Sequence, residues 1–262
     1  MRRATNGERG ARRLFPALVA GLLLVAGQCA PAVAASAVSG CLPFVGERMQ
    51  FSVGWEFIDA GLATMHVKAS GADGYRIDTF ARTNAFFDLF KKVRDTITSE
   101  GVCRGKRMQS TLFEIEQNEH TYHSKKSIRF LWRENRVSYT QSGKTDIYEV
   151  KSGHLNAIDA FLAVRSMPLK VGDIVRVPVF DSRKKYLVEV HVLKKVRMSA
   201  PWGKSVESII IEPKLKTETI FSSKGKVMIW LTNDARHVPL RMTAKIRFGR
   251  IVARLIDYSK VP

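Results

Sequence analysis

Apolar residues recur at every second position through most of this chain, and turn-forming residues separate the segments that carry them. Successive side chains of a β-strand point to opposite faces, so this period predicts strands that turn one face to a core. Residues 49–55 and 186–192 show the pattern most clearly. Asp59-Ala60-Gly61 predicts the first turn, and short turns between such segments favour antiparallel neighbours. The pattern predicts a meander of roughly eleven to thirteen strands.

Two segments depart from this period. Residues 84–93 place apolar side chains at helical spacing behind Asn84, which can cap a helix. Residues 156–168 do the same behind Asn156 and end at Pro168. The second segment divides two β-rich halves, and its apolar face indicates a packed helix rather than a flexible linker. We therefore expect a mainly β fold: a single antiparallel, strongly curved sheet or half-open barrel with one or two short helices.

The first 34 residues have the three-part order of a secretory signal peptide. Residues 2–13 are rich in arginine, residues 14–27 are apolar, and Ala32-Val33-Ala34 offers the small side chains that a signal peptidase requires. The apolar run is shorter than the ~20 residues that span a bilayer. We expect a cleaved leader, export to the periplasm and no transmembrane segment in the mature chain.

Two alternatives to a simple cleaved leader stay open. Arg12-Arg13 resembles a twin-arginine export signal, although Pro16 stands where an apolar residue is usual. Cys29 resembles the lipid-bearing cysteine of a lipoprotein, although Gln28 precedes it where a small side chain is usual. Beyond the leader at residues 1–34 we expect an N-terminal segment at 35–44 and a β-rich domain at 45–258.

Basic residues outnumber acidic ones, with 43 Lys and Arg against 24 Asp and Glu and a formal net charge of +19. The leader holds five Arg and one Glu, so the mature chain keeps +15. Such a surface attracts polyanions, among them anionic lipid headgroups and acidic envelope polymers. The basic residues are scattered, however, and lysines on strand edges also prevent aggregation. We expect no nucleic-acid partner.

Two cysteines remain in the mature chain, Cys41 and Cys103. An even count in an oxidising compartment predicts a disulfide between them. The bridge would close a loop of roughly 60 residues and stabilise the fold by about 4 kcal/mol on the chain-entropy view. The alternative is two unpaired thiols.

Few side chains are spaced for chemistry. His120 and His123, with Glu116 or Glu119, could hold a metal, but strand geometry would turn the two histidines to opposite faces. Glu114 and Glu116 share a face, as a glycosidase pair would, yet they alternate with apolar residues and fit a solvent-facing side better. The sequence lacks a Gly-x-Ser-x-Gly elbow, a P-loop, a dinucleotide fingerprint and a Cys-x-x-Cys pair. We expect no catalytic residue, no metal, no cofactor and no enzymatic activity.

Three phrases resemble DUF3108, a bacterial family of exported domains of unknown function. They are Val45–Val53 with the Ala-Gly that follows, Asp159–Arg165 running into Pro168, and Val227–Asp234 with Pro239 to Arg241. The resemblance spans about residues 44–258 and implies a cell-envelope protein without established catalytic residues. Within the last phrase, we expect Trp230 to fill the core and Asn233-Asp234 to make a turn, which leaves Pro239 and Arg241 on the strand beyond.

Two functions fit these features. The first is a non-catalytic binding module that holds an anionic lipid-like or polymeric envelope component in or beside a curved sheet. The second is a structural or assembly factor that binds another envelope protein. An apolar cavity of at least ~300 Å³ would favour the first, and a filled core the second.

Overall fold

The computed structural model describes residues 38–216, 226–246 and 249–260. The predicted signal peptide, residues 1–34, lies outside the described residues, as do residues 35–37 of the N-terminal segment. The chain divides into the units Met1–Ala34 and Ala35–Pro262, and the architecture below is that of the second unit.

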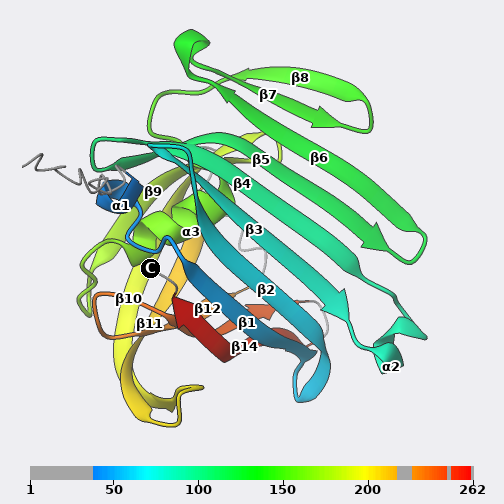
Figure 1. The fold of residues 1–262 in the computed structure, drawn as a ribbon, viewed down its shortest axis with the longest axis vertical. Helices are drawn as coiled ribbons and strands as arrows, with labels where there is room; N and C mark the ends of the chain where they lie inside the picture. Colours follow the sequence, from blue (N-terminus) through cyan, green and yellow to red (C-terminus); the bar gives the residue numbers. More distant parts are fainter. Residues whose placement is uncertain (1–37, 217–225, 247–248, 261–262) are drawn as a thin grey trace, which may run out of the picture. The chain divides into compact units, whose positions relative to one another are not determined.

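The described part of this unit forms one antiparallel sheet of fourteen strands (Figure 1). Its spatial order is β8-β7-β6-β5-β4-β3-β2-β1-β14-β13-β12-β11-β10-β9. The strands are β1 Glu47–Trp55, β2 Ile58–Ser70, β3 Gly74–Thr83, β4 Arg94–Arg104, β5 Arg107–Glu119, β6 Tyr122–Leu131, β7 Arg136–Gln141, β8 Lys144–Glu149, β9 Ile174–Asp181, β10 Lys184–Ser199, β11 Ser205–Lys216, β12 Val227–Thr232, β13 Pro239–Lys245 and β14 Arg250–Lys260.

The sheet consists of two meanders, β1 to β8 and β9 to β14, which are joined where β1 pairs with β14. Because neighbours run antiparallel throughout, the β1–β2, β3–β4, β9–β10 and β13–β14 connections all lie at one end of the sheet. We call this the α2 end, after the helix in the β3–β4 connection. The β2–β3 and β10–β11 turns lie at the opposite end.

The sheet curves without closing into a hydrogen-bonded barrel, so β8 and β9 are its two edges. Side chains and one isolated bridge span the gap between them. The rings of Tyr148 and Phe180 lie 5.5 Å apart, Arg183 pairs with Asp146 at 3.2 Å, and Leu155 bridges to β9. The expected half-open, strongly curved antiparallel sheet is therefore confirmed.

Short helices complete the described chain: α1 Val38–Cys41, α2 Ala85–Asp88, the 3₁₀ turn η1 Trp132–Glu134 and α3 Ala157–Arg165. Both predicted caps are present, since Asn84 accepts a hydrogen bond from the Phe87 amide and Asn156 from the Asp159 amide. No helix in the described part of the chain is long and apolar enough to cross a membrane.

The core lies on the concave face of the sheet, where α3 is enclosed (Figure 1). Six of the nine residues of α3 are buried, so the helix is covered on nearly all sides. One group of core residues packs α3 against β1 to β4 and the N-terminal segment, and another packs it against β9 to β12. Leu162 belongs to the first group, Ala160 and Val164 to the second.

Two details differ from the sequence-based expectation. The first hairpin turns at Glu56, whose φ is +51°, and not at residues 59–61. Gly61 lies inside β2, where a Cβ would stand 2.0 Å from the Arg82 carbonyl oxygen, so this glycine marks a close backbone approach and not a turn. The apolar period also gives no sign of β8, because five of its six residues are exposed.

Candidate functional site

Helix α3 is fastened at both ends by buried polar groups. At its N-terminus the Asp159 carboxylate accepts hydrogen bonds from Tyr75 at 2.8 Å, from Ser99 at 2.7 Å and from Ser110. The side-chain amide of Asn156 donates to the same two serines. These hydroxyls come from β3, β4 and β5, so the cluster fixes the start of α3 to three neighbouring strands.

Burial dominates the electrostatics of this first cluster. Asp159 is fully buried, and loss of water raises the pKa of its carboxyl to about 6, against the three hydroxyl donors that favour the anion. Burial, and then the charge of Asp159, raise the pKa of Tyr75 well above its ordinary value. With its oxygens fully engaged by protein donors, the carboxylate positions the helix and is not arranged to act on a substrate.

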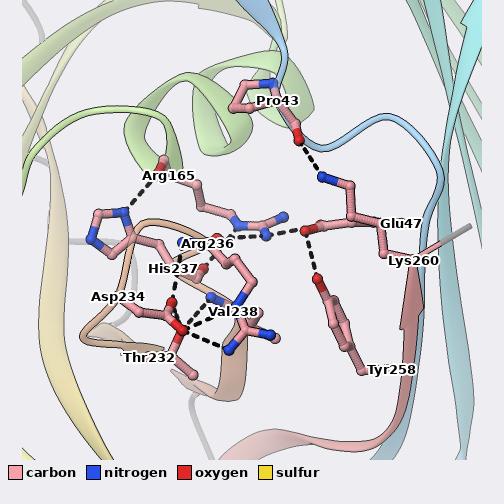
Figure 2. Close-up of polar contacts among 10 residues, drawn as sticks. All are labelled: Pro43, Glu47, Arg165, Thr232, Asp234, Arg236, His237, Val238, Tyr258 and Lys260. Atoms are coloured by element: carbon pink, nitrogen blue, oxygen red, sulfur yellow. Dashed lines mark hydrogen bonds and ion pairs between the residues drawn. The ribbon is translucent and has the colours of Figure 1, made fainter. Parts of the chain in front are cut away.

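At the other end of α3 the Arg165 guanidinium forms an ion pair with Glu47 of β1, with Nη2 and Oε2 2.9 Å apart (Figure 2). Both side chains are fully buried. Tyr258 donates to the second oxygen of Glu47 at 3.0 Å, and the guanidinium carbon lies 4.0 Å from the ring centre of Phe44. A buried charge is tolerated only when it is paired in this way.

The loop between β12 and β13 supplies the remaining partners of Arg165. The guanidinium donates to the carbonyl oxygens of His237, at 2.9 Å, and Arg236, at 3.0 Å. The His237 ring nitrogen Nδ1 lies 2.7 Å from the carbonyl oxygen of Arg165 (Figure 2). Asp234 shapes this loop by accepting from Thr232 at 2.7 Å and from the Arg236 guanidinium. Residues far apart in the sequence thus meet at the C-terminus of the helix.

Between these two anchors, α3 forms one wall of a cavity of about 320 Å³. The helix contributes Ala160, Phe161 and Val164. Strands β9 to β12 form the opposite wall with inward-facing aliphatic side chains, among them Val179 and Ile229. The cavity therefore exceeds the volume of ~300 Å³ that the sequence analysis set as favouring a binding module, and its lining is mainly apolar.

The cavity extends toward the α2 end of the sheet. Asp181 and Tyr186, which flank the β9–β10 turn, provide its polar side chains. Lys184 and Lys185 belong to the same turn and are exposed.

The two predicted cysteines are brought together. Cys41, at the end of α1, is bonded to Cys103 of β4 with their Cα atoms 5.7 Å apart. Both residues are buried, and they pack in the same part of the core as Phe44. The disulfide therefore ties the N-terminal segment to the sheet beside the Arg165 anchor.

The histidines and glutamates singled out in the sequence lie elsewhere. His120 occupies the β5–β6 turn with φ of +46°, so the strand geometry assumed for the pair does not hold there. His123 contacts Asn118 at 3.1 Å, and both line a polar groove of about 400 Å³ together with Glu116. Among the described residues, no three His, Cys, Asp or Glu side chains are grouped to hold a metal ion.

Glu114 and Glu116 occupy one face of β5, while Phe113 and Ile115 on the other face belong to the core. This arrangement fits the solvent-facing interpretation of the two glutamates.

The prediction that Trp230 fills the core is wrong, because the neighbouring Ile229 and Leu231 point inward.

On the opposite face of β12, Trp230 is half-buried beside Arg241, whose guanidinium carbon lies 5.1 Å from its ring centre. Asp234 belongs to the β12–β13 turn, as expected, and Pro239 is the first residue of β13.

Sequence reasoning missed the two anchors of α3. Tyr75 and Ser99 lie on strand faces that the alternation assigns to the core, and a polar residue at a core position signals a buried partner. Nothing in the sequence identifies that partner as Asp159. Ser110 is out of phase with Phe113 and turns inward only because the β4–β5 register shifts between Glu100 and Gly101. Glu47 and Arg165 did stand out, but only as parts of separate phrases of the family resemblance.

Comparisons with known proteins agree with this fold. A search of curated proteins found no match. A crystal structure of a β-barrel-like protein, a domain of unknown function DUF1849 from Brucella abortus, superimposes with a TM-score of 0.59 at 10% identity and covers 83% of this chain and 98% of its own. The hypothetical protein CT021 from Chlamydia trachomatis, at 11% identity and covering 86% and 92%, reaches a TM-score of 0.31, too low to support a shared fold.

The family comparison is more specific. The sequence matches the family described as "Protein of unknown function (DUF3108)" over residues 50–256. That stretch contains α3, the cluster around Asp159 and all strands that line the cavity. Of the contacts around Arg165 it leaves out Phe44, Glu47 and Tyr258. The chain therefore belongs to the DUF3108 family.

Proposed function

We propose that this protein is an exported, periplasmic binding module without catalytic activity, and that it holds a lipid-like anionic ligand in the cavity beneath α3. The observation that carries the proposal is the cavity itself, about 320 Å³ in volume and lined mainly by aliphatic side chains. A core that only had to be stable would be filled at this position, because lining atoms without neighbours forfeit packing energy.

The anchors of α3 support the same proposal. The helix is tied to β1 and β3–β5 by buried polar contacts at its two ends, while its middle faces β9 to β12 across the cavity. Because these contacts hold α3 against β1 and β3–β5, the helix does not need to pack against β9 to β12, and the cavity between them can stay open. The cavity is then a preformed feature, as binding sites for small molecules usually are.

Charge supports an anionic ligand over a neutral one. The net charge of +15 beyond the leader raises the concentration of anions near the surface. Lys184 and Lys185 belong to the β9–β10 turn that Asp181 and Tyr186 flank; neither lines the cavity, and Lys184 shares the strand face of Tyr186. A carboxylate or phosphate head placed there would gain hydrogen bonds and charge pairing at the water boundary, where the cost of desolvation is small.

A fatty-acid titration tests the proposal. The fluorescent fatty acid cis-parinaric acid should gain fluorescence on binding to the protein. Ala160→Phe places a ring into the cavity and should weaken this binding by about tenfold or more, because a filled cavity loses the buried apolar contacts. Ala69→Phe, on exposed β2 surface, is the matched control and should bind like the wild type.

Salt separates the two contributions to binding. Insertion of the tail should survive high salt, whereas the contribution of the lysines should fall, since exposed charges are screened over ~8 Å at physiological ionic strength. If the protein does not bind the fatty acid and carries no lipid when purified from the periplasm, the cavity has no role in lipid binding. The assembly factor for another envelope protein then becomes the better function.

A further inference from the structure

We propose that the α2 end of the sheet docks on the surface of an anionic lipid bilayer through a rim of exposed apolar side chains. This apolar rim consists of Phe57, Ile58, Phe86, Leu89 and Phe90. Because it is a contact surface outside the cavity, the proposal does not depend on what the cavity holds.

Exposure distinguishes the rim from the rest of the surface. Phe57 is 89% exposed, Leu89 80%, Phe90 68% and Phe86 62%. No other large apolar side chain in the described part of the chain exceeds 60%. Single exposed apolar residues are ordinary, but four aromatic or leucine side chains at one end of a molecule indicate a contact surface.

Local structure holds the rim outward. Glu56 adopts a left-handed conformation at the tip of the β1–β2 turn, which leaves Phe57 at the apex. Helix α2 is a single turn and buries none of its residues. Asn84 fixes that helix beside the start of β2 by two hydrogen bonds. Its backbone amide donates to the Ala60 carbonyl oxygen at 2.8 Å, and its side-chain amide donates to the Asp59 carbonyl oxygen at 3.0 Å.

The two parts of the rim therefore lie together, as Figure 1 shows for α2 and the β1–β2 turn. A second set of contacts makes the α2 segment rigid. The Asp88 carboxylate pairs with the Arg94 guanidinium at 2.5 Å and accepts from Thr83. The side chains are thus presented on a fixed support.

Basic residues surround the rim. Lys91 and Lys92 follow Phe90, and Lys245 and Arg250 border the β13–β14 turn; all four are exposed, and Lys91 pairs with Glu119 at 2.5 Å and Arg250 with Glu56 at 3.4 Å. Arg250 lies beside the first hairpin, because its carbonyl oxygen accepts from the Glu56 amide at 2.8 Å. Cations around protruding aromatic groups match an anionic membrane, where the rings enter the interface and the cations meet the headgroups.

The form of the rim favours lipid over a protein partner. A protein interface of standard size buries about 800 Å² per partner on closely complementary surfaces. The rim instead consists of side chains that project from a turn and from a one-turn helix. Such projections can enter a bilayer surface, which adapts to them, without a matching pocket for each.

The cavity shares this end of the sheet, since Asp181 and Tyr186 flank the β9–β10 turn. If the proposed function holds, docking would place the polar end of the cavity toward the headgroups. A lipid could then pass between bilayer and cavity at this end of the sheet. This consequence rests on the proposed function; the docking itself does not.

Vesicle co-sedimentation tests the docking. The wild type should sediment with phosphatidylglycerol vesicles at low salt and much less with phosphatidylcholine vesicles. The combined substitutions Phe57→Ser, Phe86→Ser, Leu89→Ser and Phe90→Ser should weaken binding to the anionic vesicles by about tenfold or more, because each removes an inserted apolar group.

Matched controls keep the outcome specific. Val171→Ser with Ile174→Ser changes exposed apolar residues at the opposite end and should leave sedimentation unchanged. Urea unfolding should show that both variants remain folded. Ala160→Phe should still sediment with vesicles, so loss of fatty-acid binding and loss of docking are separate results. The docking proposal is wrong if the four-serine variant sediments with anionic vesicles like the wild type. It is also wrong if the wild type does not bind anionic vesicles and instead self-associates through the rim in analytical ultracentrifugation.

Discussion

Asp159 and Glu47 are the two carboxylates that are completely buried in the described part of the chain, and each is stabilised differently. Asp159 is surrounded by neutral hydroxyl donors, and burial raises its pKa to about 6. Glu47 faces the Arg165 guanidinium and a tyrosine hydroxyl. Burial in turn lowers the pKa of Arg165, against the opposing effect of Glu47, and raises the pKa of Tyr258 to about 12. These groups should therefore respond differently to pH and to substitution.

Acidification should stabilise the fold through Asp159. Its folded pKa of about 6 lies above the ordinary aspartate value of 3.8, so the folded state favours the protonated carboxyl. This contribution is fully present below pH 3.8 and is lost as the pH rises through about 6. Across that window it amounts to about 3 kcal/mol, at 1.36 kcal/mol per pKa unit. Urea unfolding of the wild type and Asp159→Asn, from pH 7 to pH 4, should show the wild type gaining relative to the variant.

Asp88→Asn provides a control of opposite sign. The side-chain hydrogen bonds from Arg94 and Thr83 lower the pKa of Asp88, so its contribution is present at neutral pH and is lost on acidification. The wild type should therefore lose stability relative to this variant as the pH falls. An Asp159→Asn difference that does not change between pH 7 and pH 4 contradicts the assignment.

The Glu47–Arg165 pair should behave as one unit. Glu47→Ala or Arg165→Met alone leaves an uncompensated charge in the core and should reduce the free energy of unfolding by about 3–5 kcal/mol. The double variant Glu47→Ala with Arg165→Met removes both charges, so its loss should be much smaller than the sum of the two single losses. Urea unfolding in a double-mutant cycle measures the coupling, and additive losses would refute it.

At the scale of the elements, α3 depends on contacts that lie far from it in the sequence. Its own capping and apolar face are local, but Asp159 bonds to Tyr75, 84 residues away, and Arg165 to Glu47, 118 residues away. The N-terminal segment is likewise held by a distant partner, Cys103, 62 residues from Cys41. Helix and segment therefore acquire their places only when the sheet has formed.

Loss of the disulfide should release the N-terminal segment. A chain with Cys41→Ser and Cys103→Ser should lose about 4 kcal/mol of unfolding free energy on the chain-entropy view. Proteolysis should then cut before Glu47 in the variant sooner than in the wild type. Thiol titration of denatured, unreduced mature protein should find neither cysteine free, and two reactive thiols would exclude the bridge.

At the scale of the whole molecule, the half-open sheet has two edges that could recruit other chains. The contact of Tyr148 with Phe180 and the ion pair of Arg183 with Asp146 cover part of the gap. The curved sheet with α3 inside it accommodates a cavity between the helix and β9 to β12. The same architecture places the apolar rim and the polar end of the cavity at one end.

Export should remove the leader. Ala32-Val33-Ala34 fits signal-peptidase specificity, so N-terminal sequencing of the exported protein should begin at Ala35 or within a few residues of it. A mature chain that retains Arg12-Arg13, or one acylated at Cys29, would show a different route to the envelope. Either result would also remove support from the periplasmic part of the proposed function.

The sequence by itself determined the strands except β8, the antiparallel meander, the capped helix α3, the cysteine pair and the family. These follow from the alternation of side chains, from turn and cap residues and from short recognisable phrases, all of which are local. Even here, Gly61 looked like a turn residue, because close backbone approach and turn formation both favour glycine.

Only the tertiary structure decided the pairing of β1 with β14, the two anchors of α3, the cavity and the exposure of Phe86, Leu89 and Phe90. Alternation states which side chains share a face of a strand. It does not state which distant element covers that face, or whether a space remains between them. Those outcomes depend on contacts between residues far apart in the sequence, which form only when the whole sheet curves around α3.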